Sequence, residues 1–211
     1  GHWRPIGIAV MAYGYGLSVT PLQLAQAYGV LANEGVLVPS RIVLGTRDED
    51  GRFVAERPPE PRRVVSARTA VTMTNMLEGV VLRGTGGSAK VSGYHVAGKT
   101  GTAKKVVPGG GGYTDNEYFA SFGGFGPLRD PTLVGFVVLD TPRGGFYYGG
   151  LVAAPVFSRI MADALAYLRV PPDDDPWEAR RDELKAQAAK DDLVKMLNGV
   201  QVPLADDPWA I

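Results

Sequence analysis

The chain has 211 residues, 45% of them hydrophobic and 21% charged, and its 22 basic residues balance 22 acidic ones. This composition is typical of a globular protein and excludes an intrinsically disordered chain, while the lack of net charge argues against nucleic acid as a partner. With no cysteine and only two histidines, the chain lacks the residues for disulfides, thiol catalysis or a zinc cluster, and we expect neither metal nor cofactor.

The first strongly marked element is a helix that begins at Pro21. Thr20 suits the N-cap position, Gln23 completes a capping box, and Gly35 suits the end of the helix. A hairpin is expected to follow, with Asp50-Gly51 at its turn, and then an extended connector over residues 58–63. The apolar stripe predicted for the helix consists of Leu24, Tyr28 and Leu31.

A second helix is predicted from about Ser66 to Gly84, because a capping serine precedes an amphipathic run that ends at a glycine. Three strands are predicted next, over residues 93–107, 117–126 and 132–140, and a further helix over residues 152–168. The apolar face of the second helix is expected to contain Met73, Met76, Leu77, Val80 and Val81, and that of the last helix Phe157, Ile160, Met161, Ala164, Leu165 and Leu168.

The composition changes after Pro172, where a charged and helix-prone segment begins. We therefore divide the chain into a domain over residues 1–172 and a charged, partly helical C-terminal tail over residues 173–211. No apolar run reaches the roughly 18 residues that a membrane-spanning helix needs. Helices that alternate with a hairpin and a three-stranded meander predict an α+β fold, with an antiparallel sheet flanked by helices.

One short stretch, "GYHVAGKTGTAKK", allows two interpretations of its lysine. Gly93, Gly98, Lys99 and Thr100 match the spacing of a phosphate-binding P-loop, and a strand that ends at Asp140 imitates the magnesium-binding acid of such proteins. A P-loop needs a helix that starts at the lysine, whereas the residues after Lys99 do not favour one. A P-loop NTPase therefore stays a remote alternative.

The same stretch makes chemical sense as a strand. Lys99 would be a fixed cation for a carboxylate, and the hydroxyls of Thr100 and Thr102 could donate hydrogen bonds to it. Gly101 would let an extended peptide lie against the strand. Alternation places Lys99 and Gly101 on one face and the threonines on the other, so all can reach one ligand only at the edge of a sheet. A surface strand with a solvated lysine is the simpler alternative.

Four ordered blocks decide between these interpretations: "GYGLSVTPLQLAQAYGVLANEG", "RVVSARTAVTMTNMLEGVVLRGTGG", "GYHVAGKTGTAKK" and "YYGGLVAAPVFSRIM". Together they resemble the C-terminal part of class B penicillin-binding proteins, most of all the monofunctional peptidoglycan D,D-transpeptidase of cell division. The resemblance runs from about residue 10 to Pro172. It implies part of a transpeptidase domain with the fold shared by penicillin-binding proteins and serine β-lactamases.

Enzymes of this family acylate a serine with the D-Ala-D-Ala end of a peptidoglycan stem peptide and pass the acyl group to an amine of another strand. β-Lactam antibiotics imitate this donor. By resemblance, Lys99 supplies positive potential and hydrogen-bonds the serine of a second motif, and Thr100 and Thr102 bind the carboxylate of substrate or drug. The backbone N–H of Thr102 would form half of an oxyanion hole.

The resemblance also assigns three aromatic residues to the site. Tyr118, Tyr147 and Tyr148 occupy positions that form a wall against the substrate or drug side chain in similar proteins. The loop over residues 106–117 would move over the cleft. Ordinary packing of the tyrosines, and an idle flexible tip, are the corresponding alternatives.

The chain departs from the family in one respect that matters for chemistry. None of its serines is followed by lysine three places on or by asparagine two places on, so it contains neither the nucleophile motif Ser-x-x-Lys nor the motif Ser-x-Asn. In the family both motifs lie upstream. We therefore expect this chain alone to be inactive and to need the missing N-terminal part of the same domain.

The family also implies a cellular role and location for the parent protein, and it leaves two alternative functions. The parent protein would act in septal cell-wall synthesis, with roles in cell division and cell shape. It would lie at the periplasmic face of the bacterial inner membrane, held by an N-terminal segment, beside other cell-division proteins. A D,D-carboxypeptidase or serine β-lactamase is the alternative within the fold, and a non-catalytic binding fragment is the alternative from another class.

Overall fold

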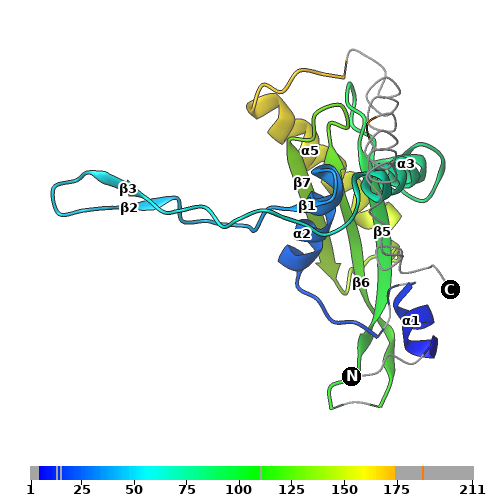
Figure 1. The fold of residues 1–211 in the computed structure, drawn as a ribbon. Helices are drawn as coiled ribbons and strands as arrows, with labels where there is room; N and C mark the ends of the chain where they lie inside the picture. Colours follow the sequence, from blue (N-terminus) through cyan, green and yellow to red (C-terminus); the bar gives the residue numbers. More distant parts are fainter. Residues whose placement is uncertain (1–4, 13, 15, 110, 174–186, 188–211) are drawn as a thin grey trace, which may run out of the picture.

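A three-stranded antiparallel sheet forms the centre of the computed structural model, which describes residues 5–12, 14, 16–109, 111–173 and 187 (Figure 1). Its strands lie in the order β5 (Ala97–Val106), β6 (Tyr113–Gly126) and β7 (Leu133–Asp140), so β5 is an edge strand. The three predicted strands are thereby confirmed. Their bounds were partly wrong, since β6 begins at Tyr113 and the predicted moving loop 106–117 shortens to residues 107–112.

The predicted strand over residues 93–107 was also too long at its start. The Tyr94 hydroxyl donates to the carbonyl of Val170 at 2.7 Å, and the His95 N–H donates to the Asp173 carboxylate at 2.6 Å. The Asp173 N–H donates in return to the carbonyl of Gly93 at 3.0 Å. Because residues 93–95 are bound to this later segment, pairing with β6 begins only at Ala97. The helix predicted within 173–211 lies outside the described residues.

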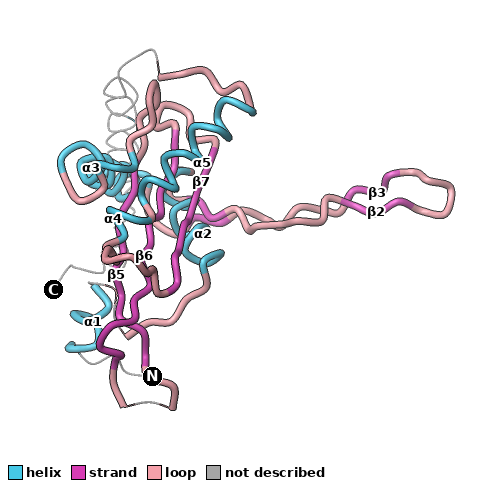
Figure 2. Tube along the Cα trace, turned by 180° about the vertical axis from the view of Figure 1, so that it is seen from behind, coloured by secondary structure: helices cyan, strands magenta, loops and turns pink. Residues whose placement is uncertain are grey.

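Two helices cover opposite faces of the sheet, α2 (Pro21–Ala32) on one and α5 (Ala154–Tyr167) on the other (Figures 1 and 2). Glycines in β6 make room for them. A Cβ at Gly123 would overlap the ring of Tyr28 on α2, and one at Gly124 would approach the ring of Phe157 on α5 at 3.1 Å. The antiparallel sheet flanked by helices is the α+β fold expected from the sequence.

Capping residues predicted the starts of two helices correctly. The Thr20 hydroxyl accepts from the N–H of Gln23 at 3.2 Å, and the Gln23 side chain accepts from the N–H of Thr20 at 2.8 Å, which completes the capping box of α2. The Ser66 hydroxyl accepts from the N–H of Thr69 at 3.1 Å at the start of α3 (Ala67–Arg83). These contacts lie within four residues in the chain, so local sequence predicts them.

The predicted apolar faces of two helices were partly wrong. Met73 and Met76 of α3 are exposed, and so are Ile160 and Leu168 at the last helix. The prediction for α3 selected only apolar residues, whereas two polar residues, Thr74 and Glu78, are also buried. The buried face of α3 consists of Ala70, Val71, Thr74, Leu77, Glu78 and Val81, and that of α5 consists of Ala154, Phe157, Met161 and Leu165.

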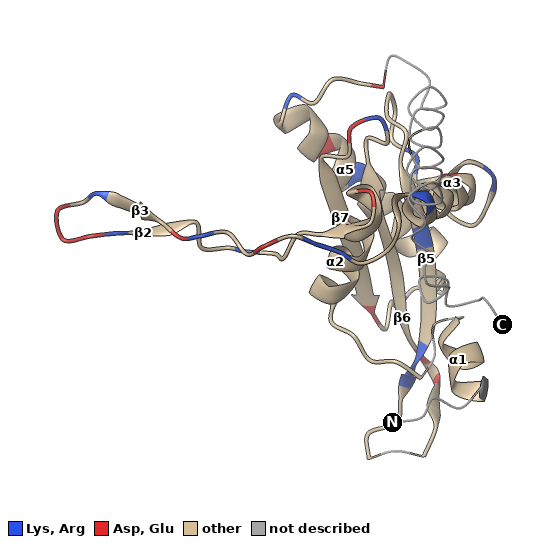
Figure 3. Ribbon diagram, viewed as in Figure 1, with Lys and Arg blue, Asp and Glu red and all other residues tan. Residues whose placement is uncertain are grey.

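A narrow hairpin extends far from the body of the molecule (Figure 1). It is formed by β2 (Gly45–Arg47) and β3 (Phe53–Ala55), and its turn is closed by the Asp48 carboxylate, which accepts from the N–H groups of Asp50 and Arg52. Its charges alternate in sign along the arm (Figure 3). At its base β1 (Val36–Leu37) pairs with β4 (Arg62–Arg63), so the predicted connector 58–63 ends in a short strand.

The remaining elements are α1 (Pro5–Ala12), the short 3₁₀ helix η1 (Gly87–Ala89) and α4 (Gly149–Val152), which leads into α5. The helical run Gly149–Tyr167 is long and apolar enough to cross a membrane by length and composition, which the sequence analysis did not anticipate. We assign it to the core instead, because Phe157, Met161 and Leu165 are buried in it against the sheet.

Candidate active site

Lys99 and Thr100 lie side by side at the free edge of the sheet. Strand alternation directs their side chains to opposite faces, yet the long Lys99 side chain bends so that its Nζ donates to the Thr100 hydroxyl at 3.0 Å. The Thr100 hydroxyl also lies 2.9 Å from the hydroxyl of Thr85, which follows α3. The sequence analysis required these residues to lie at the edge of a sheet if they are to reach one ligand, and β5 is the edge strand.

Thr102 is held by the start of α4. The N–H of Gly149 donates to the Thr102 hydroxyl at 3.1 Å. A hydroxyl accepts and donates at the same time, so its hydrogen remains for a second partner. A side chain at Gly149 would overlap the carbonyl oxygens of Gly101 and Ser121. The bare Gly149 backbone therefore lets α4 dock closely enough to reach Thr102.

Gly101 has a different neighbour from the one the sequence suggested. It pairs with Ser121 of β6, and a Cβ at Gly101 would overlap the Ser121 hydroxyl. The absence of a side chain at Gly101 therefore accommodates Ser121 within the sheet. A second function, room for an extended peptide against β5, stays a prediction.

The three tyrosines that the resemblance assigned to the site come together in the structure. The rings of Tyr118 and Tyr147 stack with centroids 4.3 Å apart and planes 15° apart. The rings of Tyr147 and Tyr148 lie 4.5 Å apart, and their hydroxyls are 3.2 Å apart. This hydrogen bond raises the pKa of Tyr148, so its phenol is uncharged near neutral pH. We call Tyr118, Tyr147 and Tyr148 the tyrosine wall.

The structure removes the nucleotide-binding interpretation of the lysine. Lys99 lies inside β5, whereas a P-loop lysine stands at the start of a helix. Asp140, the candidate magnesium ligand, instead accepts a hydrogen bond from Lys105 at 2.8 Å. Within the described part of the chain, no group of three histidine, aspartate or glutamate residues is placed to hold a metal ion.

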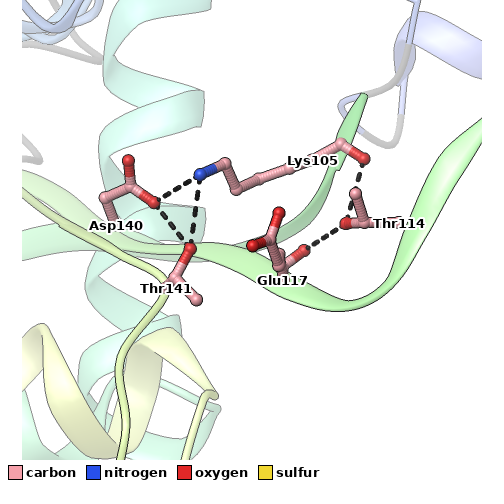
Figure 4. Close-up of polar contacts among 5 residues, drawn as sticks. All are labelled: Lys105, Thr114, Glu117, Asp140 and Thr141. Carbon is pink, nitrogen blue, oxygen red and sulfur yellow. Dashed lines mark hydrogen bonds and ion pairs between the residues drawn. The ribbon is translucent and has the colours of Figure 1, made fainter. Parts of the chain in front are cut away.

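Lys105 and Asp140 belong to a polar cluster (Figure 4), which a hydrogen bond from the Thr141 N–H joins to the carbonyl of Tyr118 in the wall. The Lys105 Nζ also donates to the Thr141 hydroxyl at 3.3 Å, and that hydroxyl donates to the same Asp140 oxygen at 2.7 Å. The hydrogen bond with Asp140 raises the pKa of Lys105, and the hydrogen bond with Lys105 lowers the pKa of Asp140. Both groups are therefore charged through the neutral range.

We expect Asp140 to titrate below the ordinary pKa of an aspartate. Its lowered folded-state pKa adds stability that is present above the unfolded-state pKa and is lost as the pH falls through the folded-state pKa. Carboxyl-carbon NMR of Asp140 checks this, with Lys105→Met as the comparison. The midpoint should move toward the ordinary value in Lys105→Met, and an unchanged midpoint would contradict the ion pair as its cause.

Sequence reasoning missed Thr85, Gly149 and the cluster around Lys105. Thr85 lies in the quoted block "RGTGG" and Gly149 in the block "YYGG", so resemblance alone was a signal for both. Lys105 ends the quoted block "GYHVAGKTGTAKK", but no local pattern indicated its contact with Asp140, which is far away in sequence. A hollow of about 430 Å³ between α2 and the start of β7 contains none of the predicted site residues.

Comparison with known proteins decides the family. Residues 1–162 match the penicillin binding protein transpeptidase domain. The chain belongs to the class B penicillin-binding proteins, through their transpeptidase domain. It is 43% identical to a probable peptidoglycan D,D-transpeptidase, PbpC, of Pseudomonas aeruginosa over 81% of this chain and 28% of that protein. Against stage V sporulation protein D of Bacillus subtilis the identity is 41%, over 80% and 26% of the two chains.

Solved structures show the same penicillin-binding fold. Penicillin binding protein 3 of Mycobacterium tuberculosis, complexed with ampicillin, matches with a TM-score of 0.74 at 41% identity, over 82% of this chain and 40% of that chain. The apo transpeptidase domain of Burkholderia pseudomallei penicillin-binding protein 3 gives a TM-score of 0.69 at 44% identity, over 82% and 50%. The chain spans about 28% of the length of the curated transpeptidases that it matches.

Proposed function

We propose that this chain is the substrate- and β-lactam-binding C-terminal part of a peptidoglycan D,D-transpeptidase that cross-links stem peptides through an acyl-serine intermediate. The observation that carries the proposal is the edge strand β5, on which Lys99 and Thr100 meet at 3.0 Å and Thr102 is held by α4. An edge strand offers its backbone to an extended peptide, and its polar side chains offer donors to a carboxylate.

Each site residue has a role in this proposal. The hydroxyls of Thr100 and Thr102 donate to the carboxylate of D-Ala-D-Ala or of a β-lactam, and Lys99 supplies the positive charge that complements it. The N–H of Thr102 donates to the oxyanion that forms when the carbonyl is attacked. The tyrosine wall contacts the side chain of the substrate or drug. Gly101 keeps the strand clear for the peptide.

The nucleophile must come from elsewhere in this account. The sequence contains neither Ser-x-x-Lys nor Ser-x-Asn, so we propose that the preceding part of the transpeptidase domain supplies both motifs. The domain would end at residue 172, with residues 173–211 as its tail. The full-length protein would act at the periplasmic face of the inner membrane in septal wall synthesis, together with other cell-division proteins. This chain alone should form no lasting adduct with labelled penicillin.

The test uses the full-length protein with a stem peptide that ends in D-Ala-D-Ala and a second peptide that offers an amine. Transpeptidation predicts a cross-linked product and release of D-alanine, both blocked by penicillin. Release of D-alanine without cross-linking would favour a D,D-carboxypeptidase, and hydrolysis of penicillin would favour a β-lactamase. A full-length protein that neither reacts with the peptide nor is acylated by penicillin would overturn the proposal.

Replacing Thr102 with valine in the full-length protein is expected to slow acylation by a carboxylate-bearing penicillin about ten- to hundredfold. A hydrogen bond to a charged acceptor contributes roughly 1.5 to 3 kcal/mol, and each 1.36 kcal/mol is about tenfold in rate. The melting temperature should also fall, because the N–H of Gly149 loses its acceptor. The measurement is the second-order acylation rate constant together with a thermal melt.

Thr102→Ser is the matched control, because serine keeps the hydroxyl for both partners. Its acylation rate should stay near that of the wild type. An unchanged rate in Thr102→Val would remove Thr102 from the carboxylate site. A fall in melting temperature without a fall in rate would assign the hydroxyl to structure alone.

A further inference from the structure

The hairpin between β5 and β6 contains an irregularity immediately before the tyrosine wall. Lys104 pairs with Tyr118 and Val106 pairs with Tyr113, so residues 114–117 stand opposite Lys105 alone. Bulges of this kind redirect the side chains that follow them. Tyr118 is the first residue after the bulge, and its orientation therefore depends on how the bulge is held.

Three sets of contacts hold the bulge. The Thr114 hydroxyl donates to the carbonyls of Lys105 at 3.3 Å and Glu117 at 3.1 Å, and so closes the bulge from within (Figure 4). The Tyr118 hydroxyl donates to the carbonyl of Asp115 at 3.3 Å. The Lys105 Nζ lies 5.3 Å from the ring centre of Phe119, the residue after Tyr118.

The same lysine joins the bulge to the end of β7. Its Nζ contacts Asp140 and Thr141, and the N–H of Thr141 donates to the carbonyl of Tyr118 at 2.8 Å. Thr141 has a positive φ of 50°, where the chain leaves β7 and runs on to Tyr147. Tyr118, one member of the stacked pair in the wall, is therefore hydrogen-bonded to this cluster, and its stacking partner Tyr147 lies six residues after Thr141 in the chain. We call Lys105, Asp140 and Thr141 the clamp.

We propose that the clamp is a positioning device for the tyrosine wall, and that Lys105 thereby determines which acyl side chains the site accepts. The proposal rests on the proposed function. The Lys105 side chain is 26% exposed and the Asp140 side chain 61% exposed, so the pair adds little as a surface ion pair. Its geometric effect is larger, because it fixes the backbone at Tyr118 through the hydrogen bond from Thr141.

The test compares two β-lactams in the full-length protein. Benzylpenicillin carries an aromatic side chain for the wall, whereas aminopenicillanic acid keeps the ring and carboxylate without that side chain. We define selectivity as the ratio of their second-order acylation rate constants. Lys105→Met should lower the selectivity about tenfold, through the benzylpenicillin rate, within the range measured for coupling between neighbouring residues. Asp140→Asn should act in the same direction, and Lys105→Arg should restore most of the selectivity.

A double variant shows whether the clamp acts through the wall. In a Tyr147→Ala background, Lys105→Met should change the selectivity no further. Equal slowing of both compounds, or unchanged selectivity in Lys105→Met and Asp140→Asn, would overturn the inference. If Lys105→Met does not fold, the isosteric and exposed Asp140→Asn decides alone. A wild type that neither compound acylates would overturn the proposed function and this inference with it, whereas an acylated wild type with unchanged selectivity overturns only the inference.

Discussion

Replacing Lys99 with methionine is expected to lower the acylation rate of the full-length protein by penicillin at least about hundredfold without unfolding it. Methionine removes the positive charge that the proposed function places beside the carboxylate, and also the donor to Thr100. Losing a charge-assisted hydrogen bond costs about 1.5 to 3 kcal/mol, and the lost electrostatic attraction adds to it. The fold should survive, because Lys99 is exposed on the edge strand.

The measurement pairs the second-order acylation rate constant with a thermal melt. Lys90→Met is the matched control, since Lys90 is an exposed lysine at the end of η1 and its replacement changes the net charge equally. The control should be acylated at the wild-type rate. A rate in Lys99→Met within threefold of the wild type would contradict the role of Lys99.

Replacing Gly149 with alanine is expected to destabilise the fold by about 1 to 3 kcal/mol, the usual cost of overpacking. The added methyl group would overlap the carbonyl oxygens of Gly101 and Ser121, and backbone atoms cannot move aside as a flexible side chain can. The start of α4 must shift, so the N–H of Gly149 leaves Thr102 and the adjacent Tyr148 leaves the wall. The acylation rate should fall together with the melting temperature.

Gly87→Ala provides the comparison for this variant. A Cβ at Gly87 would meet no atom within 4 Å, and its backbone does not lie in the positive-φ region. Its free energy of unfolding should stay within about 0.5 kcal/mol of the wild type. Equal stability of Gly149→Ala and Gly87→Ala would show that α4 tolerates displacement from the sheet, and that its docking does not hold Thr102.

The sequence predicted those parts of the fold that depend on contacts between residues close together in the chain. The capping box of α2 needs only Thr20 and Gln23, and the turn of the long hairpin needs only the residues around Asp50. The start of β5 was wrong because Asp173, far along the chain, binds His95. The face of α3 was wrong because Glu78 is buried beside His95, 3.0 Å from its ring nitrogen. Such pairings depend on tertiary structure.

The candidate site also contains residues predicted from local sequence and contacts that depend on tertiary structure. Lys99, Thr100 and Thr102 were predicted because they form one contiguous motif on one strand. The contact between Gly149 and Thr102 could not be predicted by spacing, since it requires α4 to dock against two strands. The contact between Lys105 and Asp140 could not be predicted either, because it depends on the pairing of three strands and on a register shift next to Lys105.

The measurement that tests the central claim most directly is a crystal structure of the full-length protein acylated by ampicillin. The account predicts that the drug carboxylate lies within hydrogen-bond distance of the Thr100 and Thr102 hydroxyls, beside the charge of Lys99. The phenyl group should lie against the tyrosine wall, and the acylated serine should belong to a Ser-x-x-Lys motif. A drug bound covalently with its carboxylate away from β5 would contradict the account.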